Sequence, residues 1–293
     1  MLMSFLLTAE KLTTQGFPYL KRRMGRLLIP QVTWALVPAM VFAILDYGFG
    51  IRITRIRSLS TVGWQLLTGS TAINNLMWYM TALIVLTGLA ALLVAVVKHG
   101  YARVCVLTVL TAVSIYLQQT GLNYAICSGF RSELSSTCGR IIEMIPYMCV
   151  GMLAAQYRWF DRLKEHWVSA VAMSILLFFL LNAMELFVIP EGFAYQGALK
   201  IMETVLLVTG FYVIPFDRLT GWMLQLIQFL SKYSLGIYCV HKFVGKPITN
   251  MILPALGWET NTLLSCFLIY GVSLLLSFAV SKLPGQWAKC AVM

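Results

Sequence analysis

The sequence predicts an all-α, polytopic integral membrane protein with about eight transmembrane helices. Of its 293 residues, 59% are apolar and only 11% are charged, and the mean hydropathy is +0.80. Soluble domains carry about a quarter charged residues, and the same composition excludes disordered and disulfide-rich chains. The apolar residues also come in long unbroken blocks, which predict spanning helices and not the short alternating strands of a barrel.

A hydrocarbon core about 30 Å thick needs about 20 apolar helical residues. Eight blocks approach that length, although some are short and the seventh is interrupted by polar residues. They cover residues 27–45, 76–97, 104–119, 142–156, 167–189, 199–216, 233–253 and 262–281. The apolar stretch 1–7 is too short to span and has the character of a helix end. No soluble domain fits between the blocks, so we expect one transmembrane domain over residues 1–293.

The net charge of +11 is best explained by membrane topology. When the segment before residue 27 is placed in the cytoplasm, fourteen Lys and Arg fall in inside loops and six in outside loops. This bias predicts that both termini are cytoplasmic. Because topology explains the positive charge, we do not expect nucleic acid as a partner. We expect membrane lipids to surround the protein.

The seven cysteines show no metal-ligand spacing, so no metal site is predicted. Cys127 and Cys138 share one polar loop that the charge bias places outside. They could pair there, but spacing alone does not fix disulfide geometry, and two free thiols are the other interpretation.

The N-terminal segment 19–30 concentrates cations before the first long block. Arg23 and Arg26 are three residues apart, so on a helix they share a face and could bind a phosphate together. The alternative is a basic anchor that contacts anionic lipid.

Trp78 and Tyr79 open the second block and would lie at the outer interface. An aromatic belt at the membrane surface explains these two residues without a function.

The segment 232–242 places His241 inside the seventh block, with Tyr238 one turn away on the same face. Ionisable groups within a bilayer usually face a polar interior, which favours a functional role. A buried structural histidine is an equal alternative. Lys242 and Lys246 indicate a wet or broken stretch rather than contact with lipid.

Four carboxylates lie near the outer ends of the blocks, namely Asp46, Glu143, Glu185 and Glu203. Glu185 and Glu203 fall at similar depth on consecutive helices and could form a polar pocket or supply a general base. Interfacial pairing with Arg140 or Lys200 is the simpler explanation for any one of them. The candidate residues for an acceptor pocket are Trp78, Tyr79, Glu185, Glu203 and Tyr238.

Taken together, these segments resemble the acyltransferase 3 family of integral-membrane enzymes that O-acylate bacterial surface glycans. The resemblance starts at residues 3–8 and continues through Arg23-x-x-Arg26, with Pro30 behind it. It extends through segments 76–80 and 145–152, and it is most recognisable in segment 233–241, which is similar to the family's penultimate helix.

The resemblance implies ten spans in a bacterial inner membrane and no bound cofactor. It implies acetyl-CoA or another acyl-CoA as cytosolic co-substrate, with Arg23 and Arg26 at the donor's phosphates. The acceptor would be a sugar hydroxyl of a surface polysaccharide or of its lipid-linked precursor. An O-acetyltransferase is the simplest such enzyme.

The family's essential histidine lies in a first helix that has no counterpart in this sequence, so the domain looks N-terminally incomplete. The catalytic residue is therefore unassigned, with His241 as a weak candidate, since His99 and His166 fall in cytoplasmic loops. Two alternatives follow. One is a catalytically inactive family remnant. The other is a secondary transporter or flippase-like carrier with a path lined by His241, Lys242, Glu185 and Glu203.

Overall fold

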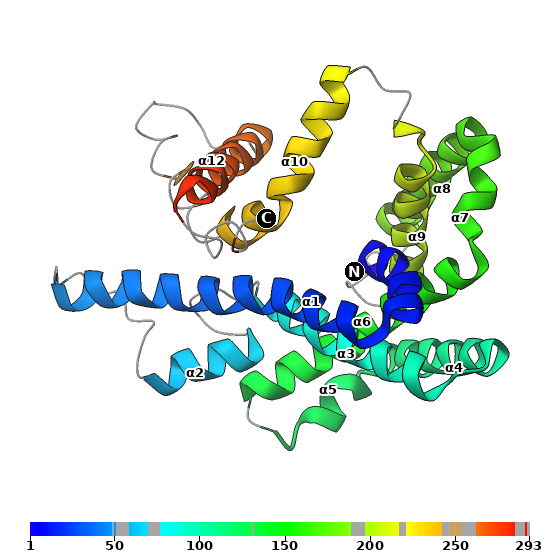
Figure 1. Ribbon diagram of the computed structural model, residues 1–293, viewed down its shortest axis with the longest axis horizontal. Helices are drawn as coiled ribbons and strands as arrows, with labels where there is room; N and C mark the ends of the chain where they lie inside the picture. Colours follow the sequence, from blue (N-terminus) through cyan, green and yellow to red (C-terminus); the bar gives the residue numbers. More distant parts are fainter. Residues whose placement is uncertain are drawn as a thin grey trace. The chain divides into compact units, whose positions relative to one another are not determined.

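All the regular structure described in the computed structural model of this chain is helical (Figure 1). The structure describes residues 1–48, 50, 59–69, 77–130, 132–188, 197–216, 221–241, 246, 249–250, 253, 262–284 and 291. Within them, 6 helical segments are long and apolar enough to cross a membrane, namely Leu2–Val41, Trp78–Val96, Gly100–Gln119, Leu134–Tyr157, Trp159–Met184 and Leu264–Lys282. The predicted all-α, polytopic membrane fold is confirmed.

The chain folds as two compact units, each assembled from two stretches of sequence. Unit 1 comprises Met1–Arg23 and Ala82–Leu219, and unit 2 comprises Met24–Thr81 and Thr220–Met293. The unit boundaries fall inside α1 (Leu2–Ala43) and α3 (Trp78–Val96). Unit 1 therefore takes the N-terminal part of α1 and most of α3.

In unit 1, the N-terminal part of α1 is a packed helix that ends at a kink. Gly16, with φ 56° and ψ −133°, breaks the helical geometry there, a conformation that glycine adopts without strain. The buried apolar side chains before the kink recur every three or four residues: Leu2, Phe5, Leu6, Ala9 and Leu12. The helix extends back to Leu2, well before the first predicted block at residue 27, and the polar Glu10 and Lys11 that lower the hydropathy lie on its exposed face.

The rest of unit 1 consists of α4 (Gly100–Gln119), α5 (Leu122–Cys127), α6 (Ser132–Tyr157), α7 (Trp159–Leu163), η2 (Lys164–His166), α8 (Trp167–Val188) and α9 (Ala198–Tyr212). Helix α6 packs against α4 and α5, and α8 packs against α9. The N-terminal part of α1 also meets α6 closely, since a Cβ on Gly151 would lie 2.6 Å from the carbonyl oxygen of Leu2.

Unit 2 contains the remainder of α1, η1 (Ile44–Gly48), α2 (Leu59–Thr68), α10 (Gly221–Val240) and α12 (Thr262–Lys282). Buried polar contacts join its segments. The Gln31 Nε2 donates to the Thr81 hydroxyl at 3.0 Å and lies 3.3 Å from the Leu66 carbonyl oxygen. Helix α10 packs along α12, where the Tyr233 hydroxyl is 3.3 Å from the Ser281 hydroxyl.

Each of the eight predicted apolar blocks contains part of a helix, but two helices besides α1 begin well before their blocks. Helix α6 starts at Ser132 instead of 142, and α10 starts at Gly221 instead of 233. Their first turns carry polar side chains such as Gln225 and Gln228, which reduce the hydropathy without disfavouring a helix. Lys242 lies outside the described residues, and Lys246 is exposed.

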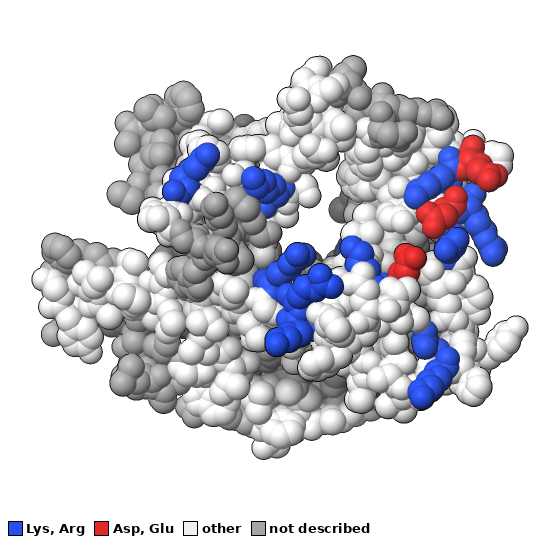
Figure 2. Space-filling view, viewed as in Figure 1, with Lys and Arg blue, Asp and Glu red and all other residues white. Residues whose placement is uncertain are grey.

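The exposed surface suits a lipid environment over much of its extent. On the face shown in Figure 2, most of the described surface carries no charged side chain. Helix α8 exposes large apolar groups such as Phe179 and Phe187. Over α7 and η2, in contrast, acidic and basic side chains gather (Figure 2). There the Lys164 Nζ forms an exposed ion pair with Asp161 at 2.8 Å.

Candidate functional site

Four of the predicted site residues come together in unit 2. Trp78 and Tyr79 begin α3, Tyr238 lies near the end of α10, and His241 follows that helix directly. Successive ring centroids are 6.1 Å apart for Trp78–Tyr79, 5.4 Å for Tyr79–Tyr238 and 6.1 Å for Tyr238–His241. Tyr270 of α12 stacks on the histidine ring, with a centroid distance of 6.3 Å and an interplanar angle of 18°. We call these five residues the aromatic cluster.

The helical period explains why two members of the aromatic cluster meet. Tyr238 and His241 are three residues apart and therefore project from one face of α10. The packing of α10 on α12 then brings in Tyr270. An edge-to-face contact of Tyr233 with Phe278 of α12, at 5.9 Å, supports the same packing further along the two helices.

His241 is held in one tautomer by its own helix. Its Nδ1 lies 2.8 Å from the Tyr238 carbonyl oxygen and 3.1 Å from the Ile237 carbonyl oxygen. A carbonyl oxygen only accepts hydrogen bonds, so Nδ1 carries the proton in this assignment. The Nε2 of the neutral ring is then left with a lone pair that can accept a proton.

Arg23 reaches into the interior of unit 1. Its Nη2 donates to the Ser4 hydroxyl at 2.6 Å, and its Nε lies 3.3 Å from the Thr87 hydroxyl. The guanidinium carbon is 6.0 Å from the centre of the Phe5 ring, and the Tyr19 hydroxyl is hydrogen-bonded to the same arginine. These contacts connect the N-terminal part of α1, the region after its kink, and α3.

Arg26, one turn further along α1, is solvent-exposed. The two arginines therefore have different surroundings, and their shared binding of a phosphate stays a prediction.

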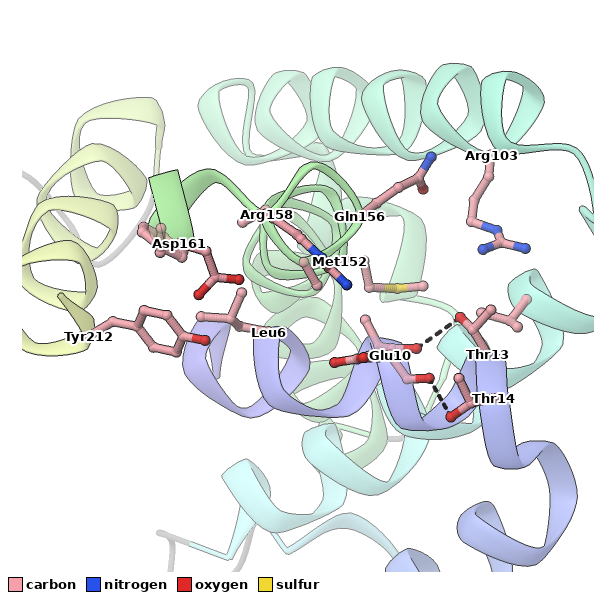
Figure 3. Close-up of a pocket in the computed structure, with 15 residues that line it drawn as sticks. Leu6, Glu10, Thr13, Thr14, Arg103, Met152, Gln156, Arg158, Asp161 and Tyr212 are labelled. Carbon is pink, nitrogen blue, oxygen red and sulfur yellow. Dashed lines mark hydrogen bonds between the residues drawn. The ribbon is translucent and has the colours of Figure 1, made fainter. Parts of the chain in front are cut away.

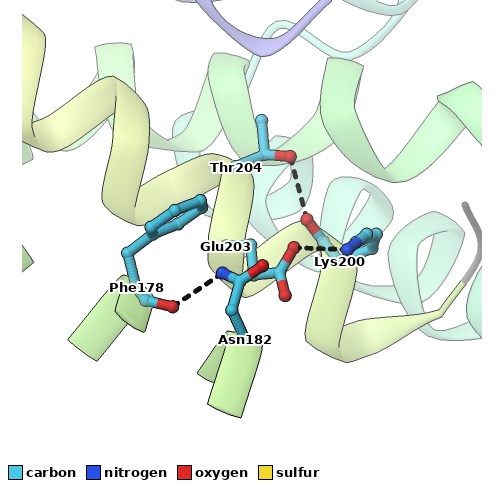
Figure 4. Close-up of polar contacts among 5 residues, drawn as sticks. All are labelled: Phe178, Asn182, Lys200, Glu203 and Thr204. Atoms are coloured by element: carbon cyan, nitrogen blue, oxygen red, sulfur yellow. Dashed lines mark hydrogen bonds and ion pairs between the residues drawn. The ribbon is translucent and has the colours of Figure 1, made fainter. Parts of the chain in front are cut away.

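Glu203 is buried in unit 1 and paired with a lysine of its own helix (Figure 4). Its Oε2 lies 2.8 Å from the Lys200 Nζ, and its side chain is only 6% exposed. Its Oε1 is buried and has no hydrogen-bond partner among the described residues. Asn182 of α8 points toward this carboxylate while donating to the Phe178 carbonyl at 2.7 Å. The Glu185 side chain lies outside the described residues, so its expected place beside Glu203 stays a prediction.

A second buried carboxylate, Glu143 of α6, forms a network that the sequence did not indicate. The Asn123 Nδ2 donates to the Glu143 Oε1 at 3.1 Å, and the Gln118 Nε2 donates to the Glu143 carbonyl at 3.2 Å. Tyr124 is also hydrogen-bonded to Glu143; burial and this carboxylate raise the pKa of Tyr124 to about 12. Asn123 and Gln118 are both buried in the structure. In the sequence, the only signal for this network was a polar side chain inside or beside an apolar helix, because such a side chain needs a hydrogen-bond partner once it is buried.

A cavity of about 250 Å³ lies within unit 1, between the N-terminal part of α1 and the ends of α4, α6 and α9 (Figure 3). Glu10, Thr13, Arg103 and Arg158 contribute polar groups to its lining. Arg103 also closes the end of α3 through two hydrogen bonds to the Val97 carbonyl.

Residues of α1 and the N-cap residue of α7 show how the cavity is placed in unit 1. Arg158 has a positive φ of 50°, which is rare for a residue with a side chain. On the helical wheel of α1, the lining residues Leu6, Glu10 and Thr13 lie opposite Ser4, which Arg23 contacts. Within the described residues, no three His, Cys, Asp or Glu side chains converge as metal ligands would.

Comparison with known proteins assigns the family. A family model described as an acyltransferase domain matches residues 1–282, nearly the whole chain. No curated protein and no solved structure matches the chain. The multi-pass helical fold and the extent of this match agree with the resemblance seen in the sequence. The chain therefore belongs to the acyltransferase 3 family and is a membrane protein of acyltransferase type.

Proposed function

We propose that this protein transfers an acyl group, most simply acetyl, from a cytosolic acyl-CoA to a sugar hydroxyl. The acceptor is a bacterial cell-surface polysaccharide or its lipid-linked precursor. The observation that carries this proposal is the Nδ1-protonated His241 among the tyrosines of the aromatic cluster. Aromatic rings offer flat apolar faces to a sugar, and the imidazole offers a proton acceptor beside them.

His241 acts as the general base in this proposal. The sugar oxygen attacks the thioester carbonyl carbon while Nε2 takes the hydroxyl proton. The carbon–sulfur bond then breaks, and the proton passes to the departing thiolate of coenzyme A. A positioned base of this kind contributes roughly 100- to 10,000-fold to a rate.

The donor binds at the basic, cytoplasmic end of the protein. The exposed Arg26 contacts the phosphates of coenzyme A, and Arg23 positions this part of α1 through Ser4 and Thr87. The protein lies in the bacterial inner membrane with both termini in the cytoplasm, as the Lys and Arg bias favours.

The test uses membranes that contain the full chain, labelled acetyl-CoA and the surface polysaccharide fraction of the host. The substitution His241→Asn keeps a donor near the Nδ1 position but removes Nε2, so transfer should fall at least 100-fold while the protein stays folded. Unchanged transfer by this variant would show that His241 is structural. Absence of transfer by the unaltered chain would favour the inactive remnant.

The donor site is tested separately by Arg26→Ala. We expect a higher KM for acyl-CoA with little change in thermal stability, because this side chain is exposed. Arg162→Ala removes an equally exposed cation from α7 and serves as the matched control. Equal KM values for the two variants would remove Arg26 from the donor site.

One observation favours a carrier as the second candidate function. The buried Lys200–Glu203 pair has an unsatisfied Glu203 Oε1, and buried ionisable groups in membrane helices often mark a substrate path. A carrier would move a labelled glycan precursor across sealed vesicles without acyl-CoA. Transport that is lost in Glu203→Gln and independent of acyl-CoA would support this alternative.

A further inference from the structure

Two cysteine thiols meet where α5 packs on α6 in unit 1. Cys127 is the last residue of α5 and is 4% exposed, and Cys138 lies in the second turn of α6 and is half-buried. The two thiols are neighbours, and Cys138 contributes to the raised pKa of Cys127. Both thiols are free in this structure.

The residues around the two cysteines hold α5 closely against α6. Gly139, next to Cys138, faces the ring of Tyr124, and a Cβ added there would lie 2.5 Å from a ring carbon. Any larger residue would therefore push α5 away from α6. One turn beyond Cys138, the Glu143 carboxylate accepts the hydrogen bond of Asn123, which fixes the other end of α5. Packing at Gly139 and at Glu143 therefore keeps Cys127 and Cys138 near each other.

We propose that Cys127 and Cys138 form a disulfide in the mature protein, oxidised by thiol–disulfide exchange with a disulfide-bearing oxidant outside the cytoplasmic membrane. Two arguments support this pairing. Neighbouring thiols on two helices that already pack together need little backbone movement to bond. The bias of Lys and Arg also places the segment between α4 and α6 on the outer side, where disulfides persist.

The exchange proceeds in two steps that balance. Cys138 is the more accessible thiol, so its thiolate attacks one sulfur of the oxidant and releases the first oxidant thiolate. The Cys127 thiolate then attacks the Cys138 Sγ and releases the second oxidant thiolate. Two cysteine thiols and one oxidant disulfide become one cysteine disulfide and two oxidant thiols, and the two cysteine protons pass to those thiolates.

The disulfide would connect α5 to α6 beside the Glu143 network. The short helix α5 spans Leu122–Cys127, and on its own it is too short to be stable. A covalent bond at its last residue would keep Asn123 and Tyr124 against Glu143 when the outer loop is exposed to solvent. The proposal is independent of acyl transfer, because it concerns the chemical state of two sulfur atoms.

The experiment is differential thiol labelling of the full chain in membranes. Free thiols are first blocked with a maleimide in denaturant, so that burial protects none of them. The protein is then reduced, labelled with a second maleimide and digested for mass spectrometry. We expect Cys127 and Cys138 to carry the second label, and the exposed Cys105 and Cys266 to carry the first. A peptide joined through Cys127 and Cys138 should appear without reduction.

Single substitutions make the test specific. Cys138→Ser should expose Cys127 to the first label, and Cys127→Ser should do the same for Cys138. Cys149→Ser, which removes a buried cysteine elsewhere in α6, should leave the joined peptide unchanged. If Cys127 and Cys138 both take the first label in the unaltered chain, the disulfide does not form and the proposal is overturned.

Discussion

The rings of Tyr79 and Tyr238 lie 5.4 Å apart between centroids and are inclined by 53°, although the two residues are far apart in the sequence. One ring comes from the first turn of α3 and the other from the last turn of α10. Their contact joins the Trp78–Tyr79 pair to His241 and so completes the aromatic cluster. Without this contact, the aromatic neighbours of His241 would be only Tyr238 of α10 and Tyr270 of α12.

This contact predicts different outcomes for two changes at Tyr238. Tyr238→Phe keeps the ring and should keep the fold, whereas Tyr238→Ala removes it and should cost about 2–4 kcal/mol of stability. Acyl transfer should fall further in the Ala variant than in the Phe variant. Both quantities are measured on purified protein by thermal unfolding and by transfer from labelled acetyl-CoA.

Tyr101→Ala is the matched control, because Tyr101 is 89% exposed on α4. Equal effects of Tyr101→Ala and Tyr238→Ala would contradict a role for the aromatic cluster.

A second prediction concerns the packing of α1 on α6. Gly151→Ala would place a Cβ 2.6 Å from the Leu2 carbonyl oxygen and 3.1 Å from the Leu6 nitrogen, both of them backbone atoms. We expect a loss of about 1–3 kcal/mol, because the two helices must separate. In Gly88→Ala of α3 the added Cβ meets no atom within 4 Å, so this change should be neutral or slightly stabilising. Thermal unfolding in detergent distinguishes them, and an unaffected Gly151→Ala would show that the contact yields easily.

Hydropathy predicted the helical class, and each predicted apolar block contains part of a helix, because spanning helices need long apolar runs. It indicated only a helix end at residues 1–7 and missed the continuation of that helix to Gly16, since Glu10 and Lys11 interrupt the apolar run although they occupy only the exposed face. The reason is physical, because hydropathy averaged over a stretch of sequence does not show on which face of the helix each residue lies.

The candidate site was predictable only where local spacing determines contact. The three-residue spacing of Tyr238 and His241 was sufficient to place them on one face of α10. The Tyr79–Tyr238 contact and the Glu143 network depend on which helices pack together, and no periodicity encodes that. Glu203 was a candidate for the acceptor pocket because of its predicted depth in the membrane. The structure pairs it with Lys200, one turn away, which is the simpler explanation given in the sequence analysis.

The proposed disulfide should close faster as the pH rises. Burial and the neighbouring Cys138 thiol raise the pKa of Cys127. Below that pKa the thiol form predominates, so the attacking thiolate becomes more abundant with each increase in pH. Reduced protein mixed with oxidised glutathione and quenched with acid should therefore show a closure rate that increases from neutral to alkaline pH. A rate that does not depend on pH in this range would mean that Cys127 does not carry out the closing step.

The last prediction compares two ion pairs with the same spacing and length in different surroundings. Lys200–Glu203 and Asp161–Lys164 are both three residues apart, and each has an N–O distance of 2.8 Å. The first pair is 23% and 6% exposed, whereas the second is 47% and 48% exposed. Removal of one partner from a buried pair leaves an uncompensated charge, so Lys200→Met should cost about 3–5 kcal/mol. Lys164→Met should cost about 1 kcal/mol or less, because water screens an exposed pair.

A double-mutant cycle separates the pairing from the loss of each side chain. Glu203→Gln alone should destabilise unit 1 because it leaves the Lys200 charge without its carboxylate. The double variant Lys200→Met/Glu203→Gln should lose much less than the sum of the single losses, since no buried charge remains. Unfolding of the three variants in detergent gives the coupling free energy. Additive losses would mean that the two charges are screened in the membrane-embedded protein, and that Glu203 is wetter than its 6% exposure indicates.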